Sequence, residues 1–428
     1  MNEVDVIRLE QFRQFKKKIR GSEDYLIVGI DVAKHKHSAF FGTPTGKTLL
    51  RRLVFENSVE GFERLLIQER ALKVQHGHKR AVFGFEPTGN YHKPLGDFLV
   101  KCAHTVVMVS GVAVKRNREL LDGRWDKHDM KDSANVADLI CQGKCLFYEY
   151  PPMALRNLRD LLALKKRLKK QEHGVRVRIR NHLLARYFPE LDKCYGRSEA
   201  ENLAIVRWCL DPSVIAGLEY EKFFRMVASR DRGIVQHRRL RAIWKKAVDS
   251  VGCDVGEAVE FEAKILVESL KQIREAIRAT DAKIKESCLQ FQEYKYLRSI
   301  PGFGPDISSK VLGAIGNPFR FNSGKEVLKM AGLDLSAKRS GKASDASIPI
   351  ISKRGKKDLR FALYQAAFTA SNRNQHFLIY YTNKLRGRAK ERGIKTKMRV
   401  KLAAKMLIIA WTLMKKKESF NPEYLNLD

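Results

Sequence analysis

The chain has 428 residues, of which 44% are hydrophobic, and this is enough for two or three domains that each bury a core. Its 82 Lys and Arg outnumber its 48 Asp and Glu, and the formal net charge of +34 favours a polyanionic partner, first of all nucleic acid. Because we find neither an apolar run of about 18 residues nor a signal peptide, the sequence excludes a membrane-spanning protein, and we expect a cytoplasmic protein with no membrane partner.

Residues 1–24 predict a basic N-terminal helix, and residues 25–150 alternate between strands and helices. The apolar runs predict strands at 26–32, 37–42, 49–55, 81–85 and 105–109. A helix is expected from Ser58, another after Tyr91, and a last helical stretch beyond the fifth strand. Short turns join antiparallel neighbours and helical crossovers join parallel ones, so we predict a mixed α/β sheet with helices on both faces. The order βββαβαβα is that of the ribonuclease H fold.

The two prolines of "EYPPMA" precede a basic region, 151–290, that we predict to be helical and coiled-coil. Coiled-coil spacing is seen first in Leu161, Leu164, Leu168 and Val175. It is seen again in Leu266, Leu270, Ile273, Ile277 and Ile284. These two arms can pair as an antiparallel hairpin, and a pair of ordinary bundle helices fits the pattern equally well.

Residues 189–250, between the two arms, predict a mixture of helix and loop. Their stretch "FFRMVASRDRGIVQHRRLRAIWKK" interleaves aromatic and basic residues, as in a contact with RNA. A solvated helix face has the same pattern, so both interpretations stay open.

Residues 291–428 predict a mostly helical C-terminal domain. In "LRSIPGFGPDISSKVLGAIG" the glycines suit a tight turn whose following helix presents free backbone amides to a phosphate, as in a helix-hairpin-helix element. A plain turn between two helices is the alternative. The segment 384–417 carries thirteen Lys and Arg against one Glu, which favours contact with phosphates.

Carboxylates stand where apolar strands end. Asp31 follows "YLIVGI", and Glu86 follows "AVFGF". Asp129 and Asp132 are three residues apart, on one face of a helix. A carboxylate on a buried strand is costly unless it is paired or binds metal, so we expect the four to converge at the sheet edge. Oxygen-only ligands suit Mg²⁺ or Mn²⁺, and two such ions can clamp a phosphodiester.

Each carboxylate also has a structural explanation. Asp31 can end a strand, Glu86 can cap a turn, and the two others can belong to a solvated acidic face; their joint occurrence favours the metal site. Two further motifs are given structural interpretations. "GTPTGKT" lacks P-loop spacing and predicts a hairpin turn, and "KHKH" at 34–37 predicts an exposed strand start beside the acidic site.

Several motifs together resemble a known family. "GIDVAK", "EPTGNY" and "DKHDMKDSA" are similar to the DEDD signature of the transposases of the insertion-sequence one-ten and eleven-eleven group. "IPGFGPDISSKVLGAIG", "AGLDLSAKRSGK" and "ISKRGKKDLRFAL" resemble that group's second domain. The resemblance covers most of residues 25–150 and 295–415, and it implies that the first domain is RuvC-like, similar to a Holliday-junction resolvase.

The resemblance also implies a serine nucleophile that precedes a glycine. Ser340 fits this position and Ser336 is the second choice. Basic residues near Ser340 are suited to neutralise a phosphate, and we expect these to bind nucleic acid: Lys338, Arg339, Lys342, Lys353 and Arg354. A family member excises and inserts its own element through a circular intermediate, guided by a structured bridge RNA that pairs with donor and target DNA.

We therefore expect an RNA-guided DNA recombinase that acts as a dimer or tetramer through a covalent phosphoserine intermediate. The rival is a RuvC-like nuclease or junction resolvase, for which the four carboxylates suffice and the serine is incidental. A third possibility, a nonenzymatic nucleic-acid-binding protein, explains the charge but not the carboxylates. A covalent protein–DNA adduct exists only in the first.

Overall fold

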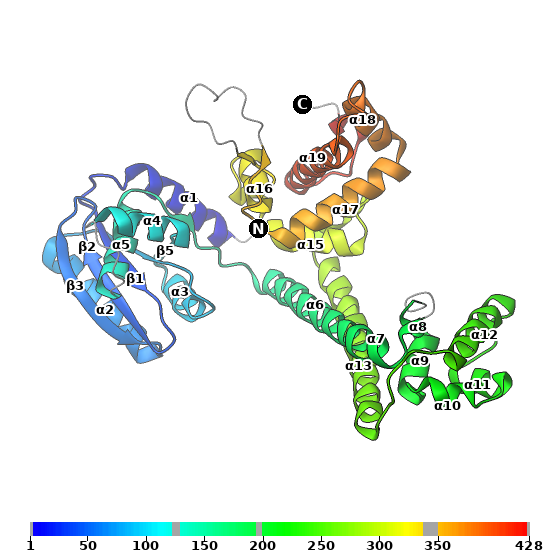
Figure 1. Ribbon diagram of the computed structural model, residues 1–428. Coiled ribbons are helices and arrows are strands. Elements are labelled where there is room, and N and C mark those ends of the chain that lie inside the picture. Colours follow the sequence, from blue (N-terminus) through cyan, green and yellow to red (C-terminus); the bar gives the residue numbers. More distant parts are fainter. Residues whose placement is uncertain (1–2, 122–128, 194–198, 337–349, 426–428) are drawn as a thin grey trace. The chain divides into compact units, whose positions relative to one another are not determined.

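The computed structural model describes residues 3–121, 129–193, 199–336 and 350–425. The chain divides into two compact units, Met1–Pro152 and Met153–Asp428. The first is an α/β unit, drawn in blue and cyan in Figure 1, and the second is mostly helical. This agrees with the predicted change of fold class near residue 150. The finer division at residues 24, 150 and 290 stays a prediction.

The first unit contains every strand that the sequence predicts. Its elements are α1 (Glu3–Lys18), β1 (Tyr25–Asp31), β2 (Lys36–Gly42), β3 (Thr48–Glu56), α2 (Val59–His76), β4 (Arg80–Phe85), α3 (His92–Lys101), β5 (Thr105–Met108), α4 (Gly111–Leu121), α5 (Asp129–Cys141) and β6 (Leu146–Phe147). Ser58 caps α2 by accepting a hydrogen bond from the Gly61 amide, and Gly77 ends it in the left-handed region. The last helical stretch is two helices, and the two-residue β6 was not predicted.

The strands form one sheet in the order β3-β2-β1-β4-β5-β6. β1 pairs antiparallel with β2 and parallel with β4, and β4 pairs parallel with β5, which confirms the predicted mixed sheet. Leu26 and Val28 pack among side chains of α2 and α3, whereas Ile27 packs among those of α1, α4 and α5. Since both faces of β1 are covered, its sequence is a continuous apolar run instead of an alternating one.

The segment "GTPTGKT" is a hairpin turn between β2 and β3, as predicted. The Thr43 amide donates to the Lys47 carbonyl at 2.9 Å, and Gly46 adopts a φ of +91° that favours glycine. The segment therefore joins antiparallel strands and does not open a helix, as a P-loop does.

The second unit contains two long paired helices, α6 (Met153–Arg178) and α13 (Glu257–Leu289). Lys165 lies 2.6 Å from Asp281, and Glu172 lies 3.2 Å from Arg274. Because the second contact lies seven residues later in α6 and seven residues earlier in α13, the helices run antiparallel, which fits both interpretations of the two arms. The stripe on α13 is largely buried, while that on α6 is half-buried. Coiled-coil geometry stays a prediction.

Between these helices the chain forms a lobe with a core of its own. Its elements are a π-helical turn (Ile179–Leu184), α7 (Ala185–Tyr187), α8 (Pro189–Asp192), α9 (Glu199–Trp208), α10 (Pro212–Ala216), α11 (Tyr220–Val227) and α12 (Ile234–Val248). Phe223 and Phe224 are buried in this core, while Arg225 on the same helix is exposed. The interleaved aromatic and basic residues of α11 therefore belong to a core face and a solvated face.

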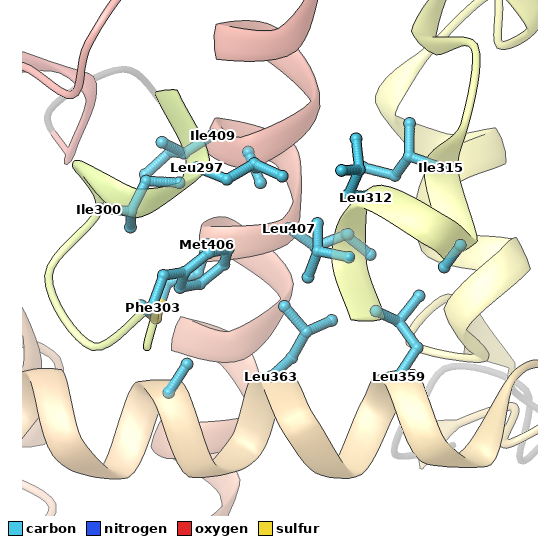
Figure 2. Packing of buried hydrophobic residues seen from close by; sticks show 14 of the residues in the cluster. Leu297, Ile300, Phe303, Leu312, Ile315, Leu359, Leu363, Met406, Leu407 and Ile409 are labelled. Atoms are coloured by element: carbon cyan, nitrogen blue, oxygen red, sulfur yellow. The ribbon is translucent and has the colours of Figure 1, made fainter. Parts of the chain in front are cut away.

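The C-terminal helices pack around a second core, which Figure 2 shows from close by. They are α14 (Gln292–Arg298), α15 (Pro305–Ile315), α16 (Gly324–Ala331), α17 (Lys357–Arg373), α18 (Gln375–Leu385) and α19 (Ile394–Lys416), with 3₁₀ turns at Pro318–Arg320 and Pro422–Leu425 and the short strands β7 (Leu335–Ser336) and β8 (Ile350–Ile351). Leu297, Phe303, Leu363 and Met406 converge there from four different segments. Within the described ranges, no helix is long and apolar enough to cross a membrane.

The "PGFGP" segment is a turn between α14 and α15. Gly302 has a φ of +88°, and a Cβ there would lie 2.6 Å from the Ala366 carbonyl oxygen, so the turn requires glycine. The first turn of α15 carries Asp306, whose carboxylate binds Lys165 and Lys310 at 2.6 Å each. Two lysines thus neutralise this carboxylate, and both interpretations of the segment, a plain helix-helix turn and a phosphate-binding element, stay open.

Candidate active site at the edge of the sheet

Two of the predicted carboxylates follow neighbouring parallel strands. β1 and β4 pair in register up to Ile30 and Phe85, and the next residues are Asp31 and Glu86. Adjacent strands lie about 4.8 Å apart, so the two residues are neighbours at one edge of the sheet. Both side chains are half-exposed.

Both carboxylates lie on the face of the sheet that α5 covers. Side chains alternate along a strand, so Asp31 shares a face with Gly29, and Glu86 shares one with Gly84. A Cβ at Gly29 would lie 2.2 Å from the Ser133 carbonyl oxygen, and one at Gly84 would lie 2.4 Å from Ile140, both in α5. The two glycines thus permit α5 to pack directly on the strands.

Helix α5 begins at the same edge. Ser133 lies over Gly29, two residues before the end of β1, while Cys141 at the other end of α5 contacts the Thr43 carbonyl at 3.7 Å. Thr43 directly follows the β2 residue that pairs with Ile27 of β1. It therefore lies toward the end of the strands that is opposite to Asp31. The first turn of α5, with Asp129 and Asp132, therefore starts near Asp31. The side chain of Asp129 lies outside the described part of the chain.

Asp132 is buried and paired with an arginine that sequence reasoning missed. Its Oδ1 lies 2.6 Å from Arg118 Nη2 of α4, but the contact is not aligned as a hydrogen bond, and this oxygen has no hydrogen-bond donor among the described residues. Asn117 donates to Asn135 Oδ1 at 2.8 Å and to Asp138 Oδ2 at 2.7 Å. These bonds fasten α4 to α5 and so hold Arg118 against Asp132.

Glu86 lies at the start of α4. A Cβ at Gly111, the first residue of that helix, would lie 2.4 Å from Glu86 Oε1, so a larger residue there would require the carboxylate to move. The backbone amides at a helix start carry partial positive charge, which favours an anionic side chain there. The sequence signal for this arrangement is Gly111, which lies just after the predicted strand at 105–109.

The predicted serine, Ser340, lies in 337–349, outside the described residues, as do Lys338, Arg339 and Lys342. The two ends of this segment are joined by the antiparallel strands β7 and β8, in which Ser336 pairs with Ile350. The following Lys353 and Arg354 are exposed. The described residues thus form the base of a hairpin, and the predicted roles of the serine and its basic neighbours stay predictions.

Two family models match the chain over these same regions. A transposase model of the DEDD, IS110 type matches residues 28–189, which include all four carboxylates. A model described as the transposase IS116/IS110/IS902 family matches residues 294–382, which include Ser340. The chain belongs to this family of transposases.

A known relative supports this assignment over almost the whole chain. The transposase is 22% identical over 405 residues to an uncharacterized 44.8 kDa protein of insertion element IS116 from Streptomyces clavuligerus. The match covers 93% of this chain and 97% of that protein. The similarity therefore extends beyond the two matched domains, into the helical region between them.

The carboxylates of the transposase that the structure describes suit a hard divalent cation. Among the described side chains, which exclude that of Asp129, no three of His, Cys, Asp or Glu are placed to hold a metal. Asp31 and Glu86 supply adjacent oxygens, and Asp132 Oδ1 is buried without an aligned donor beside a single cation, Arg118. This donor set fits Mg²⁺ or Mn²⁺, whose ligands are oxygens. The metal site stays a prediction.

One expectation about the neighbouring histidines was wrong. His37 is not an exposed residue beside the acidic site but is buried between Phe55 and Phe62, with ring centroids 5.2 and 6.2 Å away. Its Nδ1 accepts a hydrogen bond from the Ala33 amide at 3.2 Å, and burial lowers its pKa. His35 is exposed, as predicted. The period-2 alternation of β2 places His37 on the core face.

The close approach of α5 to β1 gives a first prediction. We expect Gly29→Ala to force α5 away from the strand, to lower stability by about 1–3 kcal/mol and to reduce DNA cleavage, because overpacking here displaces the turn that bears Asp132. Thermal unfolding and a cleavage assay measure both effects. The control is Gly174→Ala in α6, where no atom lies within 4 Å of the added Cβ and a small gain in stability is expected. Equal behaviour of the two variants contradicts the packing argument.

Proposed function

We propose that this transposase is an RNA-guided enzyme that cuts and rejoins DNA strands through a covalent phosphoserine intermediate. The observation that carries the proposal is the register of β1 and β4, which makes Asp31 and Glu86 neighbours on the face beneath the first turn of α5. Family membership supports a DNA substrate and dependence on a divalent metal. The sheet order supports a ribonuclease H-like, RuvC-like assignment for the first unit.

The residues proposed to hold two Mg²⁺ or Mn²⁺ ions are Asp31, Glu86, Asp129 and Asp132. Such ions, when bound, stabilise charge on the attacking and leaving oxygens of a phosphodiester. Arg118 balances Asp132, and Gly111 leaves space for Glu86 at the start of α4. The bonds from Asn117 keep α4 and α5 in register, so that these groups stay positioned.

The proposed nucleophile is Ser340. Its Oγ loses a proton and bonds to phosphorus, while the bond from phosphorus to one deoxyribose oxygen breaks and that oxygen gains a proton. A DNA hydroxyl reverses the step on a new strand. The serine ester retains the energy of the phosphodiester, whereas hydrolysis would lose it. Lys338, Arg339, Lys342, Lys353 and Arg354 are proposed to neutralise the DNA phosphates.

RNA guidance and an oligomeric state, dimer or tetramer, complete the proposal. The excess of positive charge supports the RNA partner. We expect the protein purified from cells that carry its element to retain one structured RNA encoded by that element, because a specific guide survives washing at a salt concentration that removes nonspecific nucleic acid. Sequencing of the bound RNA tests this. A random sample of cellular RNA contradicts guidance but not the serine chemistry.

A further inference from the structure

A groove runs between α9 and α13 in the helical lobe, well away in sequence from every residue assigned to catalysis. Its volume is about 650 Å³. Figure 1 shows α9 next to α13, and residues of α9, α11 and α13 line the groove. The lining consists of Ala200, Leu203, Ala204, Arg207, Trp208, Met226, Lys264, Val267, Lys271, Arg274, Glu275 and Arg278.

The walls of this groove are strongly cationic. Five lining residues are Lys or Arg, and only Glu275 is acidic. Two of the cations are engaged, since Arg274 lies 3.2 Å from Glu172 and Lys264 lies 3.7 Å from Glu260. Within the described ranges, the other three pair with no carboxylate: Arg207, Lys271 and Arg278. The groove therefore carries a surplus of charge that an anionic ligand would neutralise.

The cations on α13 lie in a row. Lys264, Lys271 and Arg278 are seven residues apart, so they share one face of the helix at intervals of about 10.5 Å. Arg274 lies beside this row, and Val267, which also lines the groove, is buried in the lobe core together with Leu270. The three cations are exposed, so their row borders the face of α13 that packs in the lobe core. One face of α13 thus packs in the lobe core, and a neighbouring face carries positive charges at regular intervals along the groove.

The groove also has an apolar side. Trp208 is half-buried at the end of α9, and the Met226 side chain is 44% exposed although it lines the groove. Trp208 packs against the lobe core, with its ring centroid 6.3 Å from that of Phe223, and is partly exposed toward the groove. A row of cations beside a partly exposed aromatic side chain is a combination with which proteins bind single strands, because bases stack on the ring while the backbone follows the charge. A duplex keeps its bases stacked inside, so the apolar side would have no partner.

We propose that the groove between α9 and α13 binds single-stranded nucleic acid, with phosphates on Lys271, Arg278 and Arg207 and a base against Trp208. This site is separate from the proposed strand-exchange chemistry and does not depend on it. The shared ligand chemistry is an unpaired strand, which either RNA or DNA supplies.

The test compares full-length variants in fluorescence anisotropy with a labelled 20-nucleotide oligomer, made as RNA and as DNA, at several salt concentrations. Each phosphate contact to a single strand changes the slope of log K against log salt by about 0.7, so Lys271→Gln with Arg278→Gln should lower the slope by about 1.4 and weaken binding about tenfold at 0.15 M salt. The control is Lys222→Gln with Lys285→Gln, which removes the same charge from exposed positions outside the groove. The control should match the wild-type protein. The better-bound oligomer identifies the source of the strand.

A second measurement locates the strand. Oligomers that carry 4-thiouridine or 5-iododeoxyuridine should cross-link to the peptide that contains Trp208 or Met226, and the double variant should lose this cross-link. Equal affinities and slopes for the two double variants, or cross-links that omit both peptides, overturn the proposal. It is also overturned if a duplex oligomer shows the same sensitivity to the groove variant, or if polyglutamate binds the groove and the strands do not. Loss of DNA cleavage in the wild-type protein affects only the proposed catalytic function.

Discussion

Ser340→Ala should form no covalent adduct with DNA and no recombined product, while it binds RNA and DNA like the wild-type protein. If Ser340 is the nucleophile, wild-type cleavage leaves DNA joined to the chain through a phosphoserine, and alanine has no oxygen to form that bond. The measurement uses labelled donor DNA, Mg²⁺ and the cognate RNA on a denaturing gel. We expect the labelled protein band to disappear completely in the variant.

Ser336→Ala is the matched control, since it removes the same atom four residues earlier in the sequence. An adduct that persists in Ser340→Ala but is lost in Ser336→Ala moves the nucleophile to β7. Wild-type cleavage that yields free DNA ends and never an adduct would instead favour the resolvase-like nuclease, in which water attacks the phosphate.

The second large effect is expected at the sheet edge. Asp31→Asn and Glu86→Gln should each reduce cleavage in Mg²⁺ or Mn²⁺ at least about a hundredfold, because each removes charge from the set of oxygens proposed to bind metal. Folding should be preserved, since both side chains are half-exposed and the substitutions keep their shape. Cleavage rates, Mn²⁺ binding by calorimetry and thermal unfolding separate these effects.

Two further variants make this test sharper. Glu63→Gln removes an exposed carboxylate from α2 and should change neither cleavage nor Mn²⁺ binding. Asp132→Asn should differ from both edge variants, because it leaves the half-buried guanidinium of Arg118 without its counter-charge and should lower stability as well. Full cleavage by Asp31→Asn or by Glu86→Gln refutes the proposed site.

The strands and the paired carboxylates were predictable because local patterns determine them. β1 is apolar throughout and then charged at Asp31, and β4 repeats the pattern at Glu86, so the shared edge follows from parallel pairing. The partner of Asp132 was not predictable, since Arg118 is one of many arginines, and only the packing of α4 on α5 selects it. β6 was missed because two residues carry no periodic signal.

The groove was beyond sequence reasoning for a related reason. Its walls come from α9 and α13, whose lining residues lie tens of positions apart, and the seven-residue spacing of Lys264, Lys271 and Arg278 resembles an ordinary solvated face until α9 is placed beside it. In the aromatic and basic stretch that begins at Phe223, that residue lies in the core, whereas Met226 of the same helix lines the groove. Local composition alone does not separate these two faces of the helix.

The antiparallel pair of α6 and α13 constrains the order in which the second unit can fold. The contact between Lys165 and Asp281 closes a loop of more than a hundred residues, and ordering so long a flexible chain costs more entropy than ordering a short one. A lobe that has already collapsed shortens the effective loop, and its core includes Leu266 and Leu270 from α13 itself. We therefore expect the lobe to fold before the two long helices pair, and mutations in the lobe core to slow folding more than mutations at the contact between Lys165 and Asp281.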